Sequence, residues 1–503
     1  MKTLTNVYRN LGASVLPQLV NIISNLILPG MIILAYGSAV NGLVSTVKVI
    51  ISYISLVGAG IAVSTTQALY RPVAQKDLST VRGMMRATED MFNKCGWAYL
   101  GIVVIAAFIY PLTISSASID YISMIVLMLV ISVSGASEFF VVGKCRSLLY
   151  ANQKVYVCTT IQAFSLLVSL VLAIVMLKLN MSIILVQAGI SFVYVMRALL
   201  LFAYVKHNYA DYVATKGVSP IKKAVEKRNN AMVHQLTGLV VTGSQTLILS
   251  IMVGLEAASI YAVYNIVFSG IHSICSNLNI AVAPFLGKSY AVNRSETTAK
   301  EYDMVDFCMN ALCAVVFMVT ALTILPFIGI YTQQADINYQ YPGFAILFVF
   351  VQLFNIRRLP CNSMINAAGH FKETQGRAII EATICLVGSI ALTHFFGMYG
   401  VLMGTGLAIG WRCLDMIVYS HIRILRNAPQ KALLRLVRSV LYVALACFVC
   451  FVNPISVDGY LMWMLYAFVL LIGAVIVLLF DSIVFERSTL LDILKETIIN
   501  NKK

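Results

Sequence analysis

Lysine and arginine residues in this sequence are confined almost entirely to every second connection between apolar stretches. There are fourteen such stretches, and most are long enough to cross a hydrocarbon core of about 30 Å at about 1.5 Å per helical residue. Of the 36 lysine and arginine residues, 30 lie before the first stretch, after the last, or in even-numbered connections. Because basic connections stay on the cytoplasmic side, the pattern predicts an all-α polytopic membrane protein with both termini in the cytoplasm.

The spans predicted from hydropathy and charge differ in length, and the thirteenth is the shortest. They lie near 12–36, 43–68, 95–114, 121–143, 155–177, 181–205, 231–254, 257–285, 304–331, 341–364, 378–397, 399–422, 439–453 and 459–485. Four acids fall in odd-numbered connections, and the same rule predicts that they mark the outer side: Asp120, Glu256, Asp336 and Asp458.

Composition excludes several classes of protein. With 60% hydrophobic and 11% charged residues, the chain matches neither a soluble domain nor a disordered one. The net charge of +15 follows from basic loops beside anionic lipid, so it does not indicate a nucleic-acid partner. Cys447 and Cys450 form a lone CxxC in an apolar stretch and are predicted to serve packing, with no metal or cofactor. We find no HExxH or phosphate-binding loop, which counts against an enzyme or an ATP-driven pump.

A weak internal repeat relates the two halves of the chain. A shift of 217 positions superimposes identical residues at equivalent points of the first two spans of each half: Gln18 with Gln235, Gly37 with Gly254, Ser52 with Ser269 and Ala74 with Ala291. Six spans separate the copies, so the repeat is parallel, as in some transporters. We therefore predict an N-terminal six-helix lobe (1–205), a basic cytoplasmic linker (206–230), a C-terminal six-helix lobe (231–425) and two further helices with a tail (426–503).

Polar side chains form stripes along equivalent spans of both halves. Their spacing places each set on one helical face: Gln18, Asn21 and Asn25; Ser52 and Ser55 after Lys48; Gln235, Thr242 and Gln245; and Asn265, Ser269, His272, Ser276 and Asn279. The stripes predict either a water-filled cavity or hydrogen bonds that hold helices together. The symmetry between the halves favours the cavity.

Several cations also lie within predicted spans, where a charge at the centre of a helix costs about 2.5–3.5 kcal/mol. Lys48 lies several residues from the outer surface. Arg357 and Arg358 lie toward the inner end of their span, so they either serve the cavity or extend to the headgroups. For Arg197 the same two alternatives hold, a role in the cavity or extension to the headgroups, and a third is an ion pair with Glu138 on the fourth span.

Two acids within spans have basic neighbours on the same helix. Glu381 lies one turn after Arg377 and Asp415 three residues after Arg412, which predicts local ion pairs. His272 is the histidine nearest to mid-membrane, and its role is either a hydrogen-bonded core imidazole or a proton relay.

Four segments resemble the Wzx-type oligosaccharide flippases of the polysaccharide-synthesis family. They read GSAVNGLVSTVKVIISYISLVGAG (37–60), SLLYANQKVYV (147–157), VYNIVFSGIHSICSNLNIAVAPFLGKSYA (263–291) and AAGHFKETQGRAIIEATICLVGSI (367–390). That family shares a superfamily with the lipid II flippases and the multidrug and toxin extruders. In two spans where such relatives often carry an acid, this chain has Val57 and Gln245.

The resemblance implies a non-enzymatic flippase that moves an undecaprenyl-diphosphate-linked oligosaccharide across the bacterial plasma membrane by alternating access. Membrane lipids, a polysaccharide polymerase and chain-length machinery are the further partners that it implies. The candidate cations for the diphosphate are Lys48, Arg197, Arg357 and Arg358, and the candidate acids for ion coupling are Glu138, Glu381 and Asp415. The alternatives are an ion-coupled drug exporter and, in another class, a membrane glycosyltransferase or polymerase.

Overall fold

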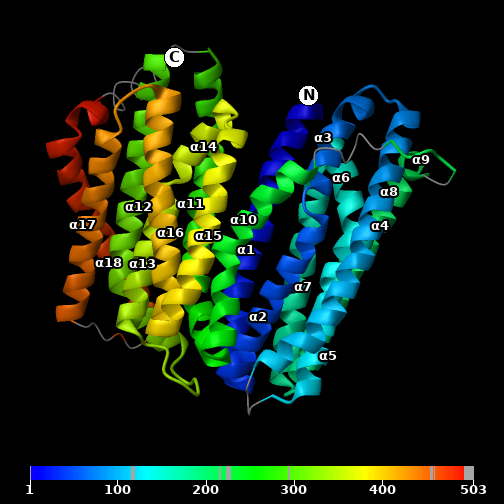
Figure 1. Cartoon of the computed structure of the whole chain (residues 1–503), viewed down its shortest axis with the longest axis horizontal. Helices are drawn as coiled ribbons and strands as arrows, with labels where there is room; N and C mark the ends of the chain where they lie inside the picture. The colour runs from blue at the N-terminus through cyan, green and yellow to red at the C-terminus, as the bar shows by residue number, and fades with distance from the viewer. Residues whose placement is uncertain are drawn as a thin grey trace. The chain divides into compact units, whose positions relative to one another are not determined.

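The chain folds as a set of long helices (Figure 1). The computed structural model describes residues 2–114, 119–214, 217–221, 228–292, 295–453, 457 and 459–491. These described residues contain 14 helices that are long and apolar enough to cross a membrane, and they contain no strand. The predicted all-α class and the predicted number of spans are therefore confirmed.

Contacts along the chain divide it into two compact units. Unit 1 comprises Met1–Ala262 and Ala335–Ile337, and unit 2 comprises Val263–Gln334 and Asn338–Lys503. This boundary falls inside a helix, later than the 206–230 connection. Much of that connection lies outside the described residues, as does Asp458. The lobe boundaries derived from the repeat stay a prediction.

Unit 1 begins with ten α-helices. These are α1 (Lys2–Tyr36), α2 (Ser38–Ser55), α3 (Ile61–Ala74), α4 (Leu78–Ile109), α5 (Tyr121–Ser137), α6 (Gly143–Ala151), α7 (Val155–Lys178), α8 (Ile183–Asn208), α9 (Ala210–Val213) and α10 (Arg228–Met252). Short helical turns extend or link them: η1 (Leu56–Gly58), η2 (Tyr110–Thr113) and η3 (Glu138–Val142). Its core forms where α2 packs against α4 and α5, around Leu43, Val47, Tyr99 and Met128.

Unit 2 takes most of α11 (Leu255–Val292) and all later helices. These are α12 (Ser295–Tyr331), α13 (Pro342–Arg357), α14 (Leu359–Ala368), α15 (Phe371–Phe396), α16 (Met398–Tyr419), α17 (Gln430–Val452) and α18 (Tyr460–Phe485), with the turn η5 (Ser420–Leu425) after α16. Stacked rings from three helices join its core: the ring centroid of Phe268 on α11 lies 4.7 Å from that of Phe348 and 6.5 Å from that of Phe317.

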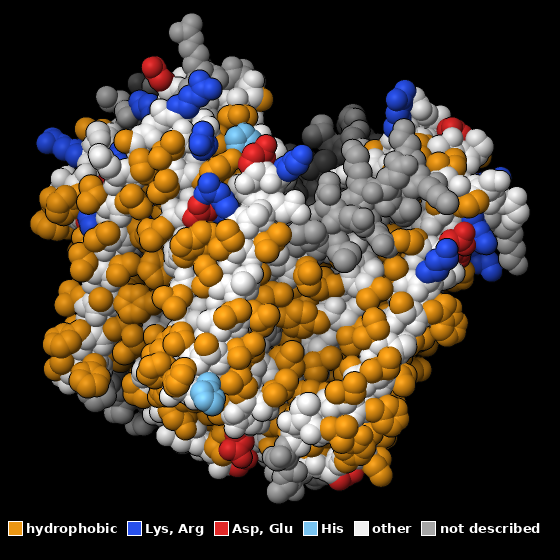
Figure 2. Space-filling model, in the orientation of Figure 1, with side chains coloured by type: hydrophobic (Ala, Val, Ile, Leu, Met, Phe, Trp, Pro, Cys, Tyr) orange, Lys and Arg blue, Asp and Glu red, His pale blue; other side chains and the backbone are white. Residues whose placement is uncertain are grey.

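Large apolar side chains remain exposed along the flanks of the helices. On the face that Figure 2 shows, they cover much of the length of the helices, whereas lysine and arginine side chains lie mainly toward helix ends. On α18, Leu461, Phe468 and Phe480 are each more than half exposed. A soluble protein rarely carries so much contiguous apolar surface, and a lipid bilayer accounts for it.

The first turn of α2 is held by an acid from a distant connection. Gly37 precedes the helix at φ +85°, a conformation that favours glycine. The Ser38 backbone N–H donates to both carboxylate oxygens of Asp336, at 3.0 and 3.1 Å. Partial burial alone would raise the pKa of Asp336, but these hydrogen bonds outweigh it and hold the pKa below its usual range. Asp336 is therefore ionised at neutral pH, where it complements the positive end of α2.

The thirteenth span corrects the sequence prediction. We predicted a short segment at 439–453, but α17 begins at Gln430 and has 23 residues. Lys431, Arg435 and Arg438 were assigned to a cytoplasmic connection because they are charged. They lie inside the helix because acids of unit 2 neutralise them, as described below.

Helices α15 and α16 pack with almost no space between their backbones. A Cβ atom at Gly404 would lie 2.2 Å from the backbone nitrogen of Ser389, and one at Gly400 would lie 2.1 Å from the carbonyl oxygen of Leu392. With Ala408, these glycines repeat every four residues along one face of α16. Small residues at this spacing let membrane helices approach closely, and van der Waals contact then stabilises the pair.

We expect Gly404→Ala to lower the free energy of unfolding by about 1–3 kcal/mol, because the new methyl group meets backbone that cannot move aside. The matched control is Gly410→Ala on the same helix, where the nearest atom to an added Cβ is 4.0 Å away. That change should be neutral or should stabilise by up to about 1 kcal/mol. Unfolding of both variants in detergent measures the difference, and equal stability would contradict the packing argument.

Candidate functional site

The polar stripe of unit 1 is exposed on three helices. On α1, Gln18, Asn21 and Asn25 are all exposed. On α10, Gln235 and Thr242 are exposed. In lipid, exposed amides would lose hydrogen bonds that water supplies, so this face is suited to water or to polar ligand.

The stripe continues on α2, which packs on α1 and α10. Lys48 and Ser52 are exposed and Ser55 is half-buried, while Val47, Ile51 and the other side of the helix are buried. Lys48 forms no ion pair with any described residue. The ammonium group thus stays available on a membrane-spanning helix, where a charge without a partner is costly unless water or an anion solvates it.

In unit 2 the stripe lies on α11. Ser269 is exposed, and Asn265, His272 and Ser276 are half-buried. His272 is close enough to Arg358 for the two side chains to interact electrostatically. Of the α11 stripe, His272 is therefore the residue placed near Arg358.

Two of the predicted stripe residues do not share this exposure. Gln245 is 1% exposed, and its amide nitrogen donates to the Val241 carbonyl at 2.6 Å. Asn279 is 6% exposed and donates to Ser363 Oγ at 2.8 Å. Helical spacing placed each residue in line with the polar stripe of its own helix, but neighbouring helices cover that part of the stripe. Both residues therefore contribute to packing and not to an exposed polar face.

Arg358 belongs to a cluster of three arginines and two acids from three helices of unit 2. It follows α13 directly, and it bonds to Glu381 on α15 and to the Asn355 side-chain oxygen at 2.8 Å. Arg412 on α16 lies 3.4 Å from Glu381 and 2.6 Å from Asp415. The fifth member, Arg377, pairs with Asp415. We call this set the Arg358 cluster, and it carries one surplus positive charge.

The partners within the Arg358 cluster differ in part from those expected. The Arg412–Asp415 pair is confirmed. Glu381, however, pairs with Arg358 and Arg412 and not with Arg377, one turn before it on the same helix. The close packing of α15 on α16 brings Asp415 to Arg377 and leaves Glu381 to cations from other helices.

In unit 1, Arg197 pairs with Glu138 at 3.7 Å, which was one of the alternatives that the sequence left open for it. Its guanidinium also lies over the ring of Tyr194 at 5.0 Å, and the side chain is 15% exposed. Glu138 begins the π-helical turn η3 and also binds Arg146 at 2.6 Å. Because its charge is paired with Glu138, Arg197 is less available to a ligand than Lys48.

Arg357 is buried, unlike the neighbouring Arg358. Its side chain is 1% exposed, and its two terminal nitrogens donate to Asp306 at 2.6 and 2.9 Å. Asp306 also accepts from Arg435 at 3.0 Å. Arg357 is therefore buried and paired with an acid of the protein, and we assign it a structural role in place of the diphosphate contact that the resemblance implied.

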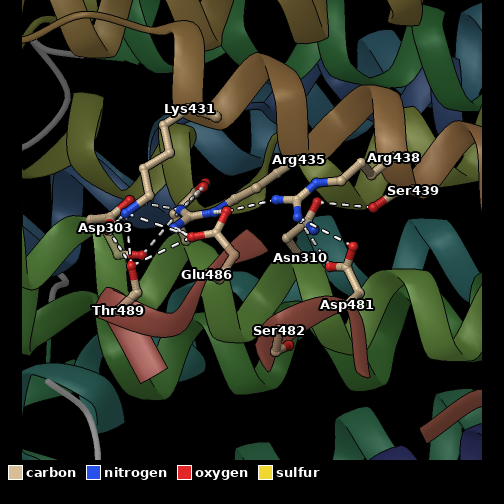
Figure 3. A network of polar contacts seen from close by, with 12 residues as sticks. Asp303, Asn310, Lys431, Arg435, Arg438, Ser439, Asp481, Ser482, Glu486 and Thr489 are labelled. Carbon is tan, nitrogen blue, oxygen red and sulfur yellow. Dashed lines mark hydrogen bonds and ion pairs between the residues drawn. The ribbon is translucent and has the colours of Figure 1, made fainter. Parts of the chain in front are cut away.

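Through Asp306, Arg357 is connected to Arg435 and to a larger charged network around α17. Figure 3 shows the part of that network around Lys431, Arg435 and Arg438. Lys431 binds Asp303 at 2.7 Å, Arg435 binds Glu486 at 2.8 Å, and Arg438 binds Glu486 and Asp481 at 2.6 and 3.2 Å. With Asp306 and Arg357, the network holds four cations and four acids, so its charges balance. Burial alone would raise the pKa of Glu486, but the two arginines hold it below its ordinary value.

The sequence analysis missed this network, although a signal was present. Lys431, Arg435 and Arg438 are spaced i, i+4 and i+7, and Asp303 and Asp306 are spaced i and i+3. Each set therefore lies on one helical face. Among the residues that the structure describes, no three histidine, cysteine, aspartate or glutamate side chains are grouped as metal ligands would be.

We expect cysteines at Ser52 and Ser269 to react with a small water-soluble thiol reagent, because both side chains are exposed on polar faces. The matched controls are Val47→Cys and Phe268→Cys, buried on the same helices. The native cysteines must first be replaced, since Cys308 is exposed. Equal protection of all four positions would mean that the stripes face lipid or protein instead of water.

Comparisons with known proteins bear on the fold. No family model and no curated protein sequence matches the chain. Among solved structures, it is similar to an inward-facing multidrug resistance MATE family transporter of the MOP superfamily (15% identity, TM-score 0.62, 82% of this chain and 95% of that one). It is also similar to the lipid II flippase MurJ in an inward closed conformation (14% identity, TM-score 0.66, 95% of this chain and 99% of that one). A third similar structure is that of the Vibrio cholerae MATE transporter VcmN (14% identity, TM-score 0.55, 84% of this chain and 99% of that one). At these identities the likeness establishes a shared fold.

Proposed function

We propose that this chain is a flippase that moves an undecaprenyl-diphosphate-linked oligosaccharide from the inner to the outer leaflet of the bacterial plasma membrane. The observation that carries the proposal is Lys48, an exposed cation on a membrane-spanning helix that has no acidic partner among the described residues. Such a charge is expensive to keep in a membrane, so it indicates a function. A diphosphate passing along α2 would supply the missing negative charge.

The Arg358 cluster supports the same kind of substrate. Its surplus positive charge and the half-buried polar side chains of α11 suit a ligand that is anionic at one end and rich in hydroxyl groups at the other. Arginine contacts phosphate oxygens through two parallel hydrogen bonds, whereas lysine acts as a point charge. Lys48 would then attract the diphosphate, and Arg358 would orient it.

The fold also favours a flippase of this kind. The likeness to the lipid II flippase extends over 95% of this chain, compared with 82% and 84% for the two MATE transporters. We infer that the two units alternate in exposing the polar faces to either side of the membrane. The sugar head would follow these faces while the lipid tail stays in the bilayer, so transport needs no covalent chemistry.

In this proposal the topology rests on the pattern of basic connections, and the partners rest on the family resemblance. Both termini would lie in the cytoplasm, where lipid-linked intermediates are assembled. A polymerase and chain-length machinery would receive the flipped unit. The orientation is tested by cysteines at Asp120 and Glu256, which should label from outside intact cells, and at Lys76, which should not.

An ion-coupled exporter of cationic drugs is the second candidate. Such a transporter would need an available acid within its spans, to attract cations or to exchange protons. Glu138, Glu381 and Asp415 each contact two guanidinium groups, and those positive charges offset the attraction that each acid would have for a cation. The basic character of the polar faces therefore favours an anionic substrate over this alternative.

The experiment that tests the function compares a deletion strain with the same strain complemented by the intact gene. Mass analysis should show an undecaprenyl-diphosphate-linked oligosaccharide accumulating on the inner leaflet of the deletion strain. The purified protein in vesicles should then make that lipid accessible to a reagent on the opposite side. Normal levels of the intermediate together with accumulation of a fluorescent cation in the cells would overturn the proposal in favour of drug export.

A further inference from the structure

The Arg358 cluster is arranged as a chain in which positive and negative side chains alternate. Its order is Arg358, Glu381, Arg412, Asp415 and Arg377, and each neighbouring pair is in contact. A cation therefore stands at each end, and both acids lie inside the chain. The side chains of Arg358 and Arg377 are 18% and 39% exposed, whereas those of Glu381 and Arg412 are 8% exposed. The chain is thus more accessible at its ends than in its middle.

Protein groups already use the donors with which Arg358 would bind a phosphate. Its Nε and Nη2 atoms donate to the side-chain oxygen of Asn355 at 3.2 and 2.8 Å, and its Nη1 atom donates to Glu381. A phosphate that takes two parallel hydrogen bonds from Arg358 competes with these contacts. Hydrogen bonds between two ionised groups are roughly twice as strong as neutral ones, so Glu381 competes more strongly than the neutral Asn355.

Glu381 can release Arg358 and still keep a cationic partner. Its Oε1 atom accepts from Arg358, and its Oε2 atom lies 3.4 Å from Nε of Arg412. A buried acid without any cation would be strongly destabilising, but Arg412 remains beside Glu381 when Arg358 turns to a ligand. Asp415 does not depend on Arg412 alone, because it also pairs with Arg377. An exchange of partners at Arg358 therefore leaves no acid of the cluster unpaired.

The backbones that carry the cluster are held in place. Arg357, directly before Arg358, donates two hydrogen bonds to Asp306, and these fix the end of α13. Helices α15 and α16 approach so closely that a Cβ atom at Gly404 would meet the backbone of Ser389. An exchange of partners at Arg358 therefore proceeds through its long side chain and needs no movement of a helix.

We propose that Glu381 is an internal competitor for the diphosphate at Arg358. It yields Arg358 to the arriving diphosphate while it stays with Arg412, and it takes Arg358 back as the diphosphate leaves. This inference rests on the proposed function. Transport requires a site that binds strongly enough for the substrate to enter and weakly enough for it to leave. A carboxylate that competes for the same guanidinium weakens binding and so promotes release.

The test measures how tightly the purified protein in nonionic detergent binds farnesyl diphosphate, a soluble polyprenyl diphosphate. Glu381→Gln keeps the size of the side chain and removes its charge. This variant should bind the probe at least about fivefold more tightly than the parent, the lower end of the coupling typical of two linked binding events. The probe should also dissociate more slowly by a similar factor, because affinity differences within one site lie mainly in the dissociation rate.

The matched control is Asp415→Asn, which removes one negative charge from the same cluster at an acid whose cations are Arg412 and Arg377. It should tighten binding clearly less than Glu381→Gln, because it does not free a donor of Arg358. Glu381→Gln should have no tightening effect in a protein that also carries Arg358→Gln. If Glu381→Gln cannot be purified, Glu381→Asp decides: its shorter carboxylate should loosen the contact with Arg358, so binding should again tighten.

Flipping in vesicles adds a readout of release. At saturating substrate, Glu381→Gln should flip the lipid-linked oligosaccharide more slowly than the parent, although it binds the probe more tightly. Arg358→Gln should bind the probe more weakly. These results together would separate a competitor from an acid that only stabilises the fold.

The inference and the proposed function can fail separately. Unchanged or weaker binding by Glu381→Gln, equal tightening by Asp415→Asn, tightening that persists without Arg358, or flipping by Glu381→Gln at the parental rate would overturn the role of Glu381. Binding unaffected by Arg358→Gln would overturn it as well, since the diphosphate would then bind elsewhere. A parent that shows the expected binding but moves no lipid-linked oligosaccharide would contradict the proposed function alone.

Discussion

Replacing Lys48 by glutamine is expected to slow flipping of the lipid-linked oligosaccharide by about 10- to 100-fold, with protein levels unchanged. A hydrogen bond to a charged group contributes about 1.5–3 kcal/mol, and each 1.4 kcal/mol corresponds to a factor of ten. Because Lys48 is exposed and has no acidic partner among the described residues, its loss should leave folding intact. The intermediate trapped on the inner leaflet, measured by mass analysis, reports the defect.

Three further variants show whether the defect is specific. Lys48→Arg keeps the charge and should be tolerated better than Lys48→Gln. Arg358→Gln should impair flipping more than Arg358→Lys, since only arginine offers two parallel donors. Lys178→Gln, which removes an exposed lysine at the end of α7, should have no effect. If every neutral variant flips at the normal rate, the diphosphate binds elsewhere and these cations serve topology.

The second large effect concerns stability instead of transport. Arg435→Met should lower the free energy of unfolding by about 3–5 kcal/mol, the range typical for breaking a buried ion pair. Arg435 is 1% exposed, and its loss would leave Glu486 and Asp306 with one cation fewer in a network whose charges balance. Thermal or chemical unfolding in detergent measures this loss.

The control for this experiment is Arg82→Met, because Arg82 lies at the surface and is 3.8 Å from an acid that is 79% exposed. Exposed ion pairs contribute about 0–1 kcal/mol, so this variant should behave as the parent. Arg435→Met should also unfold earlier than Lys431→Met, since Lys431 is 45% exposed and is partly solvated by water. Equal stability of all three variants would mean that the network is not needed to hold α17 in place.

The sequence predicted the parts of the site that depend on one helix. Helical spacing identified exposed or half-buried polar residues of α1, α2 and α11, because residues on one face meet the same surroundings. It also predicted the Arg412–Asp415 pair, whose members are three residues apart. The Arg197–Glu138 pair was one of the alternatives that the sequence left open for Arg197, and the structure shows that pair.

The same reasoning failed where neighbouring helices decide the outcome. Gln245 and Asn279 follow their stripes but are covered by other parts of the fold. Glu381 has a suitable partner on its own helix and binds two arginines from elsewhere. The length of α17 was underestimated because Arg435 and Arg438 were treated as charges facing water, although acids of unit 2 neutralise them.

By itself the sequence determined that this is an all-α membrane protein, and it predicted the 14 candidate spans found among the described residues, because solvation by a bilayer is a local property of each segment. Only the tertiary structure decided which intramembrane charges remain available. Arg357 and Arg358 are adjacent in the sequence, yet one is buried against Asp306 and the other joins a cluster with surplus charge. The difference arises because an ion pair depends on distances between helices that lie far apart in the chain, and no local pattern encodes those distances.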